Sequence, residues 1–146
     1  MQAPNREWPE MAYRVNWEDA QVPQEAAPGL MLAVPLTLRN TGGRVWPASV
    51  VYVSYHWFRD GALIVWDGER TGLPRDLRAG GRASLAAHVK TPPEPGAYML
   101  QITLVHEQVV WFEQKGADTV VRPVVVSAAT PPRDCGNGSA SCRATQ

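Results

Sequence analysis

The sequence has no excess charge of either sign: its 146 residues include 14 basic and 14 acidic side chains. A nucleic-acid-binding protein needs an electropositive surface, so nucleic acid is not an expected partner. Long apolar runs are also lacking, and the strand-sized apolar stretches predict no membrane insertion. Residues 1–10 carry prolines and charges where an export signal has an apolar core. We therefore expect a cytoplasmic protein, or a cell-envelope location if the chain is a fragment of a longer protein.

Cysteine is scarce, and Cys135 and Cys142 both lie in the last dozen residues. Six residues separate them, which is enough to close a small disulfide, and the sequence leaves open whether they do so. No histidine lies beside them, so a metal site there lacks ligands. The Gly, Ser and Asn residues around them are typical of a flexible tail. Neither a metal nor another cofactor is expected.

Helical periodicity is absent from every segment of ten or more residues. Instead, alternating segments separated by Gly and Pro turns predict an all-β fold, an immunoglobulin-like antiparallel β-sandwich of about seven to nine strands. We expect a leader or linker over residues 1–10, the sandwich over 11–127 and a flexible tail over 128–146. The expected strands are 12–17, 30–39, 51–58, 62–66, 82–90, 97–107, 109–112 and 118–127.

The strand over residues 51–58 is the most informative, because alternate residues of a strand point to opposite faces of a sheet. The set expected in the core is Val51, Val53, Tyr55 and Trp57. The set expected on the outer face includes Tyr52, His56 and Phe58. Replacing Trp57 with alanine should unfold or badly weaken the domain, whereas alanine on the outer face should reduce binding and cost little stability.

A ligand site is predicted on that outer face. An immunoglobulin-like order would place strand 97–107 beside this one, and the hairpin strand would add either Trp66 and Ile64 or Leu63 and Val65. Aromatic rings beside Gln, Glu and His suit a sugar, whose apolar face stacks while its hydroxyls form hydrogen bonds. Alternatively, a partner protein covers this face, or it is plain solvated surface. The candidate ligand-binding residues are Tyr52, His56, Phe58, Trp66, Gln101, Thr103 and Glu107.

A family resemblance starts at residues 40–47, Asn-Thr-Gly-Gly-Arg-Val-Trp-Pro. This segment resembles the Asn-x-Gly…Trp-Pro signature of bacterial immunoglobulin-like domains related to the four-tryptophan domain of autophagy receptors. Together with residues 54–57, 66–71, 73–77, 93–98, 104–107 and 110–112, it resembles the accessory domain attached to bacterial glycosyltransferases and methyltransferases of surface-polysaccharide synthesis. In outline it is also similar to the sugar-binding sandwich of O-antigen exporters. The resemblance covers about residues 28–127 and implies an accessory role in which a glycan is recognised.

No catalytic residues are expected, and the chain is not predicted to be an enzyme. His106 and Glu107 are adjacent, so on a strand they point to opposite faces and cannot act as a pair. There is no nucleophile elbow, phosphate loop or cluster of metal ligands. A hydrolase that uses the loop acids Asp67, Glu69 and Asp76 is a further hypothesis. The predicted function is a non-catalytic binding module for carbohydrate; the alternative is a protein-interaction module that docks a catalytic domain or self-associates.

Overall fold

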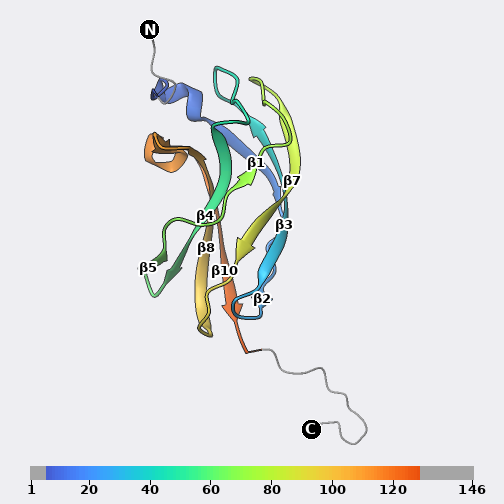
Figure 1. Cartoon of the computed structure of the whole chain (residues 1–146), viewed down its shortest axis with the longest axis vertical. Helices are drawn as coiled ribbons and strands as arrows, with labels where there is room; N and C mark the ends of the chain where they lie inside the picture. Colours follow the sequence, from blue (N-terminus) through green and yellow to red (C-terminus); the bar gives the residue numbers. More distant parts are fainter. Residues whose placement is uncertain (1–5, 129–146) are drawn as a thin grey trace, which may run out of the picture.

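The computed structural model describes residues 6–128, which form two β-sheets packed face to face (Figure 1). The described residues do not include residues 1–5 or residues 129–146. Nearly all of the tail expected over residues 128–146, with both cysteines, therefore lies outside them. The first sheet has the order β1 (Val15–Ala20), β3 (Met31–Asn40), β7 (Arg82–Lys90). The second has the order β2 (Glu25–Ala26), β10 (Val120–Val126), β8 (Gly96–His106), β4 (Val51–Arg59), β5 (Ala62–Val65). Two further strands extend it, β6 (Thr71–Gly72) beside β4 and β9 (Val110–Trp111) beside β8.

The connectivity confirms the immunoglobulin-like fold. From β3 the chain crosses to the second sheet at β4, returns to the first sheet at β7 and crosses again at β8, which gives the strand orders A-B-E and G-F-C-C′ of that fold. Two hallmarks accompany this order. Trp57 is buried on β4, the C strand, and the Tyr98 hydroxyl near the start of β8 donates a hydrogen bond to the Glu94 carbonyl at 2.7 Å. The second feature is the tyrosine corner of these sandwiches.

The predicted core set of β4 is confirmed, since Val51, Val53, Tyr55 and Trp57 are all buried between the sheets. The β4–β5 hairpin turns at Asp60-Gly61, a dipeptide that favours two-residue hairpin turns. Both turn residues have positive φ, 52° and 78°, as a two-residue type I′ turn requires. Trp46 is buried at one end of the sandwich and its Nε1 donates to the Ala12 carbonyl at 2.8 Å.

The N-terminal segment differs from the expectation. The strand expected over residues 12–17 begins only at Val15, because a 3₁₀ helix, η1 (Glu10–Tyr13), precedes it. Tyr13 packs edge-on against Phe112 at 4.9 Å, and Trp8, expected in a leader, stacks on His106 at 3.9 Å. Burial of these rings fixes the turn, which alternation alone does not reveal.

Two segments expected to be connections also contain short strands. Residues 18–29 include β2, which pairs with β10, and residues 71–81 include β6, which pairs with β4. Each has only two residues, too few for a periodic pattern to mark. They extend the second sheet at its two edges.

Trp57 provides the test of the core. The side chain is fully buried, and its Nε1 donates to the Lys90 carbonyl at 2.9 Å. Trp57→Ala is expected to lower the free energy of unfolding by about 3–5 kcal/mol, measured by urea denaturation. Met99→Ala, which truncates an exposed side chain on the neighbouring strand, should change it by about 0.5 kcal/mol or less. Equal losses for the two variants would contradict this assignment of faces.

Candidate ligand-binding groove

The predicted neighbour of β4 is confirmed: β8 pairs with it in antiparallel register, with Ser54 opposite Thr103 and His56 opposite Gln101. Directly paired residues share a face, so these four side chains all point outward, away from the core. On the other side of β4 the hairpin is irregular. A bulge lies between the pairs Trp57–Val65 and Phe58–Leu63.

Because of this bulge, the hairpin follows neither predicted register. Leu63, as the partner of Phe58, and Trp66, which stacks on His56, both lie on the outer side.

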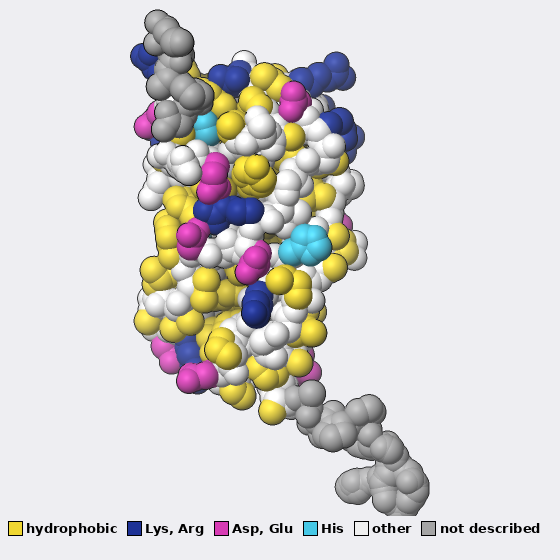
Figure 2. Space-filling view, in the orientation of Figure 1, with side chains coloured by type: hydrophobic (Ala, Val, Ile, Leu, Met, Phe, Trp, Pro, Cys, Tyr) yellow, Lys and Arg dark blue, Asp and Glu magenta, His cyan; other side chains and the backbone are white. Residues whose placement is uncertain are grey.

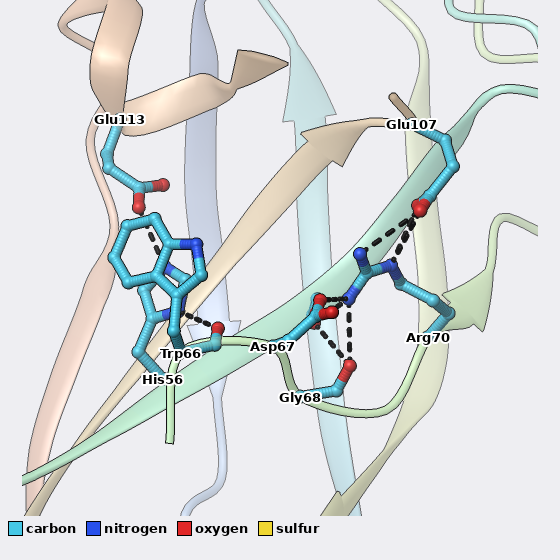
Figure 3. A network of polar contacts seen from close by, with 8 residues as sticks. His56, Trp66, Asp67, Gly68, Arg70, Glu107 and Glu113 are labelled. Atoms are coloured by element: carbon cyan, nitrogen blue, oxygen red, sulfur yellow. Dashed lines mark hydrogen bonds and ion pairs between the residues drawn. The ribbon is translucent and has the colours of Figure 1, made fainter. Parts of the chain in front are cut away.

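The outer face of β4 is covered by other parts of the chain rather than open. The loop that follows β5 lays Trp66 flat on His56, with ring centroids 3.8 Å apart and planes 5° apart. Trp111 of β9 lies beside both rings, with its centroid 4.5 Å from that of the imidazole and 5.2 Å from that of Trp66. His56 is therefore 0% exposed, although it points away from the core between the sheets. Figure 3 shows the indole of Trp66 lying over His56.

A buried polar pair joins β4 to the second 3₁₀ helix, η2 (Phe112–Lys115). His56 Nε2 lies 2.7 Å from Glu113 Oε2 (Figure 3). The Thr103 hydroxyl donates to Glu113 Oε1 at 2.7 Å. His56 Nδ1 contacts the carbonyl oxygen of Trp66, which can only accept a hydrogen bond, so Nδ1 carries a proton.

Burial alone would raise the pKa of the Glu113 carboxyl, but hydrogen bonds from His56, Thr103 and its own backbone outweigh burial and leave the pKa below its usual value. Glu113 is therefore a carboxylate and can only accept. Both ring nitrogens of His56 thus face oxygen acceptors, the Trp66 carbonyl and the Glu113 carboxylate.

Arg70 ties the Trp66 loop to the end of β8. Its Nε and Nη2 bind the Glu107 carboxylate in a bidentate pair at 2.7 and 3.1 Å (Figure 3). Its Nη1 contacts Asp67 Oδ1 at 2.7 Å, the Gly68 carbonyl at 2.8 Å and the Ser54 hydroxyl at 3.2 Å. Hydrogen bonding to Glu107, followed by that to Asp67, raises the pKa of the guanidinium despite its partial burial.

A groove of about 300 Å³ opens between the Trp66 loop and the turn that joins β8 to β9. Its volume is at the lower end of the range for small-molecule sites. Gln108 in that turn has φ 63°, a left-handed conformation that is uncommon for a residue other than glycine and that gathers at functional sites. Its lining includes Trp66, Asp67, Arg70, His106, Glu107, Gln108, Trp111 and Gln114.

The predicted site residues divide into three groups. Trp66 and Glu107 line the groove. His56 and Thr103 are fully buried beneath the groove, so in this structure they cannot touch a ligand. The expectation that alanine at His56 would cost little stability assumed an exposed side chain, and the structure does not support that assumption. The other three lie on the outer face but not at the groove: Tyr52 and Phe58 are half-buried, and Gln101 donates from Nε2 to the Thr119 hydroxyl at 3.1 Å.

Sequence reasoning missed most of the groove. Trp111 lies in the strand expected over residues 109–112 and Arg70 in the resemblance segment 66–71, but neither signal said where its segment lies in space. Gln108, Glu113 and Gln114 follow β8 in a stretch without periodicity. The signal that links them to the site is spatial: β9 and η2 fold back over β8 and reach β4.

Within residues 6–128 there is no group of three or more His, Cys, Asp or Glu side chains that could hold a metal ion. In the same range no helix is long and apolar enough to cross a membrane.

Glu113→Ala tests the buried pair. Removing one partner of a buried ion pair leaves the other uncompensated, and the 18% exposure of Glu113 points to the lower end of the usual cost, a loss of about 3 kcal/mol. Glu69→Ala, an exposed acid in a nearby loop, is the control and should change stability by about 0.5 kcal/mol or less.

The pH dependence of the same variant follows from the lowered pKa. Glu113 stabilises the fold above its unfolded pKa, near the ordinary value of 4.5, and this contribution is lost as the pH falls through the folded pKa. The difference between wild type and Glu113→Ala, measured by urea denaturation, should therefore shrink on acidification. A difference that is small at pH 7 or grows in acid would contradict the pair.

No family model and no curated protein matches this chain. Among solved structures it is similar to the CARDB domain of PF1109 from Pyrococcus furiosus in solution, with 18% identity over 77% of this chain and 92% of that one and a TM-score of 0.46. The crystal structure of the same domain in complex with di-metal ions is 16% identical over 80% of this chain and 91% of that one, with a TM-score of 0.42. A family 123 glycoside hydrolase from Clostridium perfringens gives 13% over 82% of this chain, 28% of that chain, and a TM-score of 0.40. Likeness at this level concerns the fold and carries no function over to this chain.

Proposed function

We propose that this domain is a non-catalytic binding module that takes a carbohydrate in the groove between the Trp66 loop and the β8–β9 turn. The observation that carries the proposal is the pair of tryptophans at the groove, with ring centroids 5.2 Å apart and planes 62° apart. Trp66 is 37% exposed and Trp111 is half-buried, so both rings offer surface to a ligand. An apolar sugar face stacks on such rings, while its hydroxyls meet the side chains of Glu107, Gln108 and Gln114.

The rings are held in place before any ligand arrives. Trp66 and Trp111 both rest on the buried imidazole of His56, and the guanidinium of Arg70 lies 5.0 Å from the ring centroid of Trp111. A site whose side chains are already ordered loses less conformational entropy on binding. This preorganisation supports recognition of a small, rigid ligand.

The carboxylates near the groove suit binding better than glycoside hydrolysis. A hydrolase of this kind needs two acids across the scissile bond, one of them a proton donor with a raised pKa. Here Glu107 and Asp67 are both paired with Arg70, and the pKa of Glu113 is lowered rather than raised. Asp76 Oδ1 accepts a hydrogen bond from the Ala48 N–H at 2.8 Å, a structural contact in its loop.

The wider context that we propose is an accessory role in the synthesis of surface polysaccharides, as the resemblance of the signature segments implies.

The visible surface carries charges of both signs rather than of one sign. Dark-blue and magenta side chains lie close together near the middle of the face in Figure 2. A ligand that binds through ring faces and hydroxyl groups needs no strong field.

Titration with bacterial polysaccharide fragments, followed by the indole N–H signals in NMR spectra, tests this function. Binding should shift the signals of Trp66 and Trp111, and Trp111→Ala should weaken binding by more than about 1 kcal/mol, the scale of a residue central to an interface. Met99→Ala, on an exposed position of the same sheet, is the control. Unchanged indole signals with every fragment would contradict the proposal.

Self-association is a second candidate function, and the edge strand β5 favours it. Among the described residues 6–128, β5 pairs with β4 alone; Ala62–Val65 carries no charge, and Leu63 and Ile64 are 51% and 46% exposed. An uncharged, unpaired strand edge is an open template for pairing with another strand. A second copy that pairs through its own β5 would extend the sheet across a twofold axis.

Sedimentation velocity over a concentration series tests this second function. If β5 pairs with β5, the wild type should form dimers as the concentration rises, and Ile64→Lys should abolish them because two like charges then meet across the axis. Met99→Lys, the same charge change at an exposed position on an interior strand, should leave the dimer intact. A monomer at all concentrations, or equal behaviour of the two variants, would rule out pairing through this edge.

A further inference from the structure

We infer that the groove discriminates between classes of sugar: it accepts uncharged sugars and disfavours those that carry a carboxylate or another acidic group. This inference rests on the proposed function, since it names the ligand class of the same groove. Its basis is the state of Arg70, the cation to which an acidic sugar would ordinarily bind.

The donors of Arg70 are already used by the protein. A guanidinium has five N–H groups. Nε and Nη2 each donate to Glu107, and the two hydrogens of Nη1 are shared among Asp67, Gly68 and Ser54. At most one N–H, on Nη2, is left over from these contacts. A ligand carboxylate therefore cannot form a bidentate pair with Arg70 unless it displaces Asp67 or Glu107.

The balance of charge at the groove points the same way. Its lining contains two carboxylates, Asp67 and Glu107, and one guanidinium, Arg70, so one negative charge is in excess. His106 also borders the groove, but it is buried beneath Trp8, and burial together with the nearby Arg44 lowers its pKa. An imidazole with a lowered pKa is uncharged at neutral pH and does not offset the excess. An anion that enters the groove meets net repulsion.

Apart from the Glu107 carboxylate, the polar groups that remain for a ligand are uncharged amides. Gln108 is exposed at the β8–β9 turn. Gln114 accepts the backbone N–H of Trp111 with Oε1 at 3.1 Å, which leaves its NH₂ group to donate. Neutral donors and acceptors beside two indole rings match sugar hydroxyls. Arg70 is accordingly a positioning residue that fixes the Trp66 loop against β8.

The test compares two variants that change the charge of the chain equally. Glu107→Gln removes the carboxylate that neutralises Arg70, while the amide oxygen can still accept one of its hydrogen bonds. Glu69→Gln, in the same stretch between β5 and β6, is the matched control, because Glu69 is exposed and forms no ion pair within residues 6–128. The probes are hexose oligosaccharides in gluco, galacto and manno configurations, each paired with the oligosaccharide of the corresponding hexuronic acid.

In the wild type and in Glu69→Gln, the neutral member of a binding pair should bind more tightly than its acidic counterpart at low salt. In Glu107→Gln the ratio should move toward the acid by about two- to fivefold, the scale of one solvent-exposed ion pair. Added salt should reduce this change. Without any ligand, the Arg70 Nε–H signal in NMR spectra should exchange slowly with solvent in the wild type and faster in Glu107→Gln.

Three outcomes would overturn the inference. Tighter binding of the acidic sugar by the wild type would show that Arg70 is available to ligands. An equal shift in Glu107→Gln and Glu69→Gln would assign the effect to overall charge. If neither member of any pair binds while the Arg70 signal behaves as expected, the network is as described and the proposed function itself fails.

Discussion

The outer half of this domain depends on one buried contact, the pair formed by His56 on β4 and Glu113 in η2. An imidazole on a sheet face is costly to bury unless each of its ring nitrogens has a hydrogen-bond partner. Here Glu113 and the Trp66 carbonyl satisfy the two ring nitrogens, and Thr103 binds the remaining carboxylate oxygen. The pair joins segments 57 residues apart and holds the two tryptophans in place over the sheet.

As a consequence, β4 is packed on both sides. Its inner residues, such as Trp57, belong to the core between the sheets, whereas Ser54 and His56 are buried under a second, smaller layer that consists of the Trp66 loop, β9 and η2. The Tyr98 corner and the Asp60-Gly61 turn fix the ends of the neighbouring strands, so this second layer adds to a sandwich that is otherwise of the usual kind.

The sequence could predict the sandwich, the parity of β4 and the pairing of β4 with β8, because period-two alternation and turn chemistry are local signals. It could not predict that the Trp66 loop, β9 and η2 cover the outer face of β4. Alternation places His56 on the outer face of β4. Whether that face is exposed to water depends on where Trp111 and Glu113 lie, and these residues belong to a two-residue strand and a four-residue 3₁₀ helix, which are too short for a periodic pattern. The bulge between Trp57 and Phe58, which selects Trp66 as the covering residue, is likewise invisible in the alternation.

The central claim is that the buried contact between His56 and Glu113 holds the outer layer in place. The most direct test is to observe the ring N–H groups of His56 by ¹⁵N NMR of a histidine-labelled sample. Because both ring nitrogens of His56 face acceptors, we expect ring N–H protons that exchange slowly with solvent and a coupling or contact from Nε2–H to the Glu113 side chain. An imidazole with one bare nitrogen, or ring protons that exchange as fast as those of the exposed His88, would contradict it.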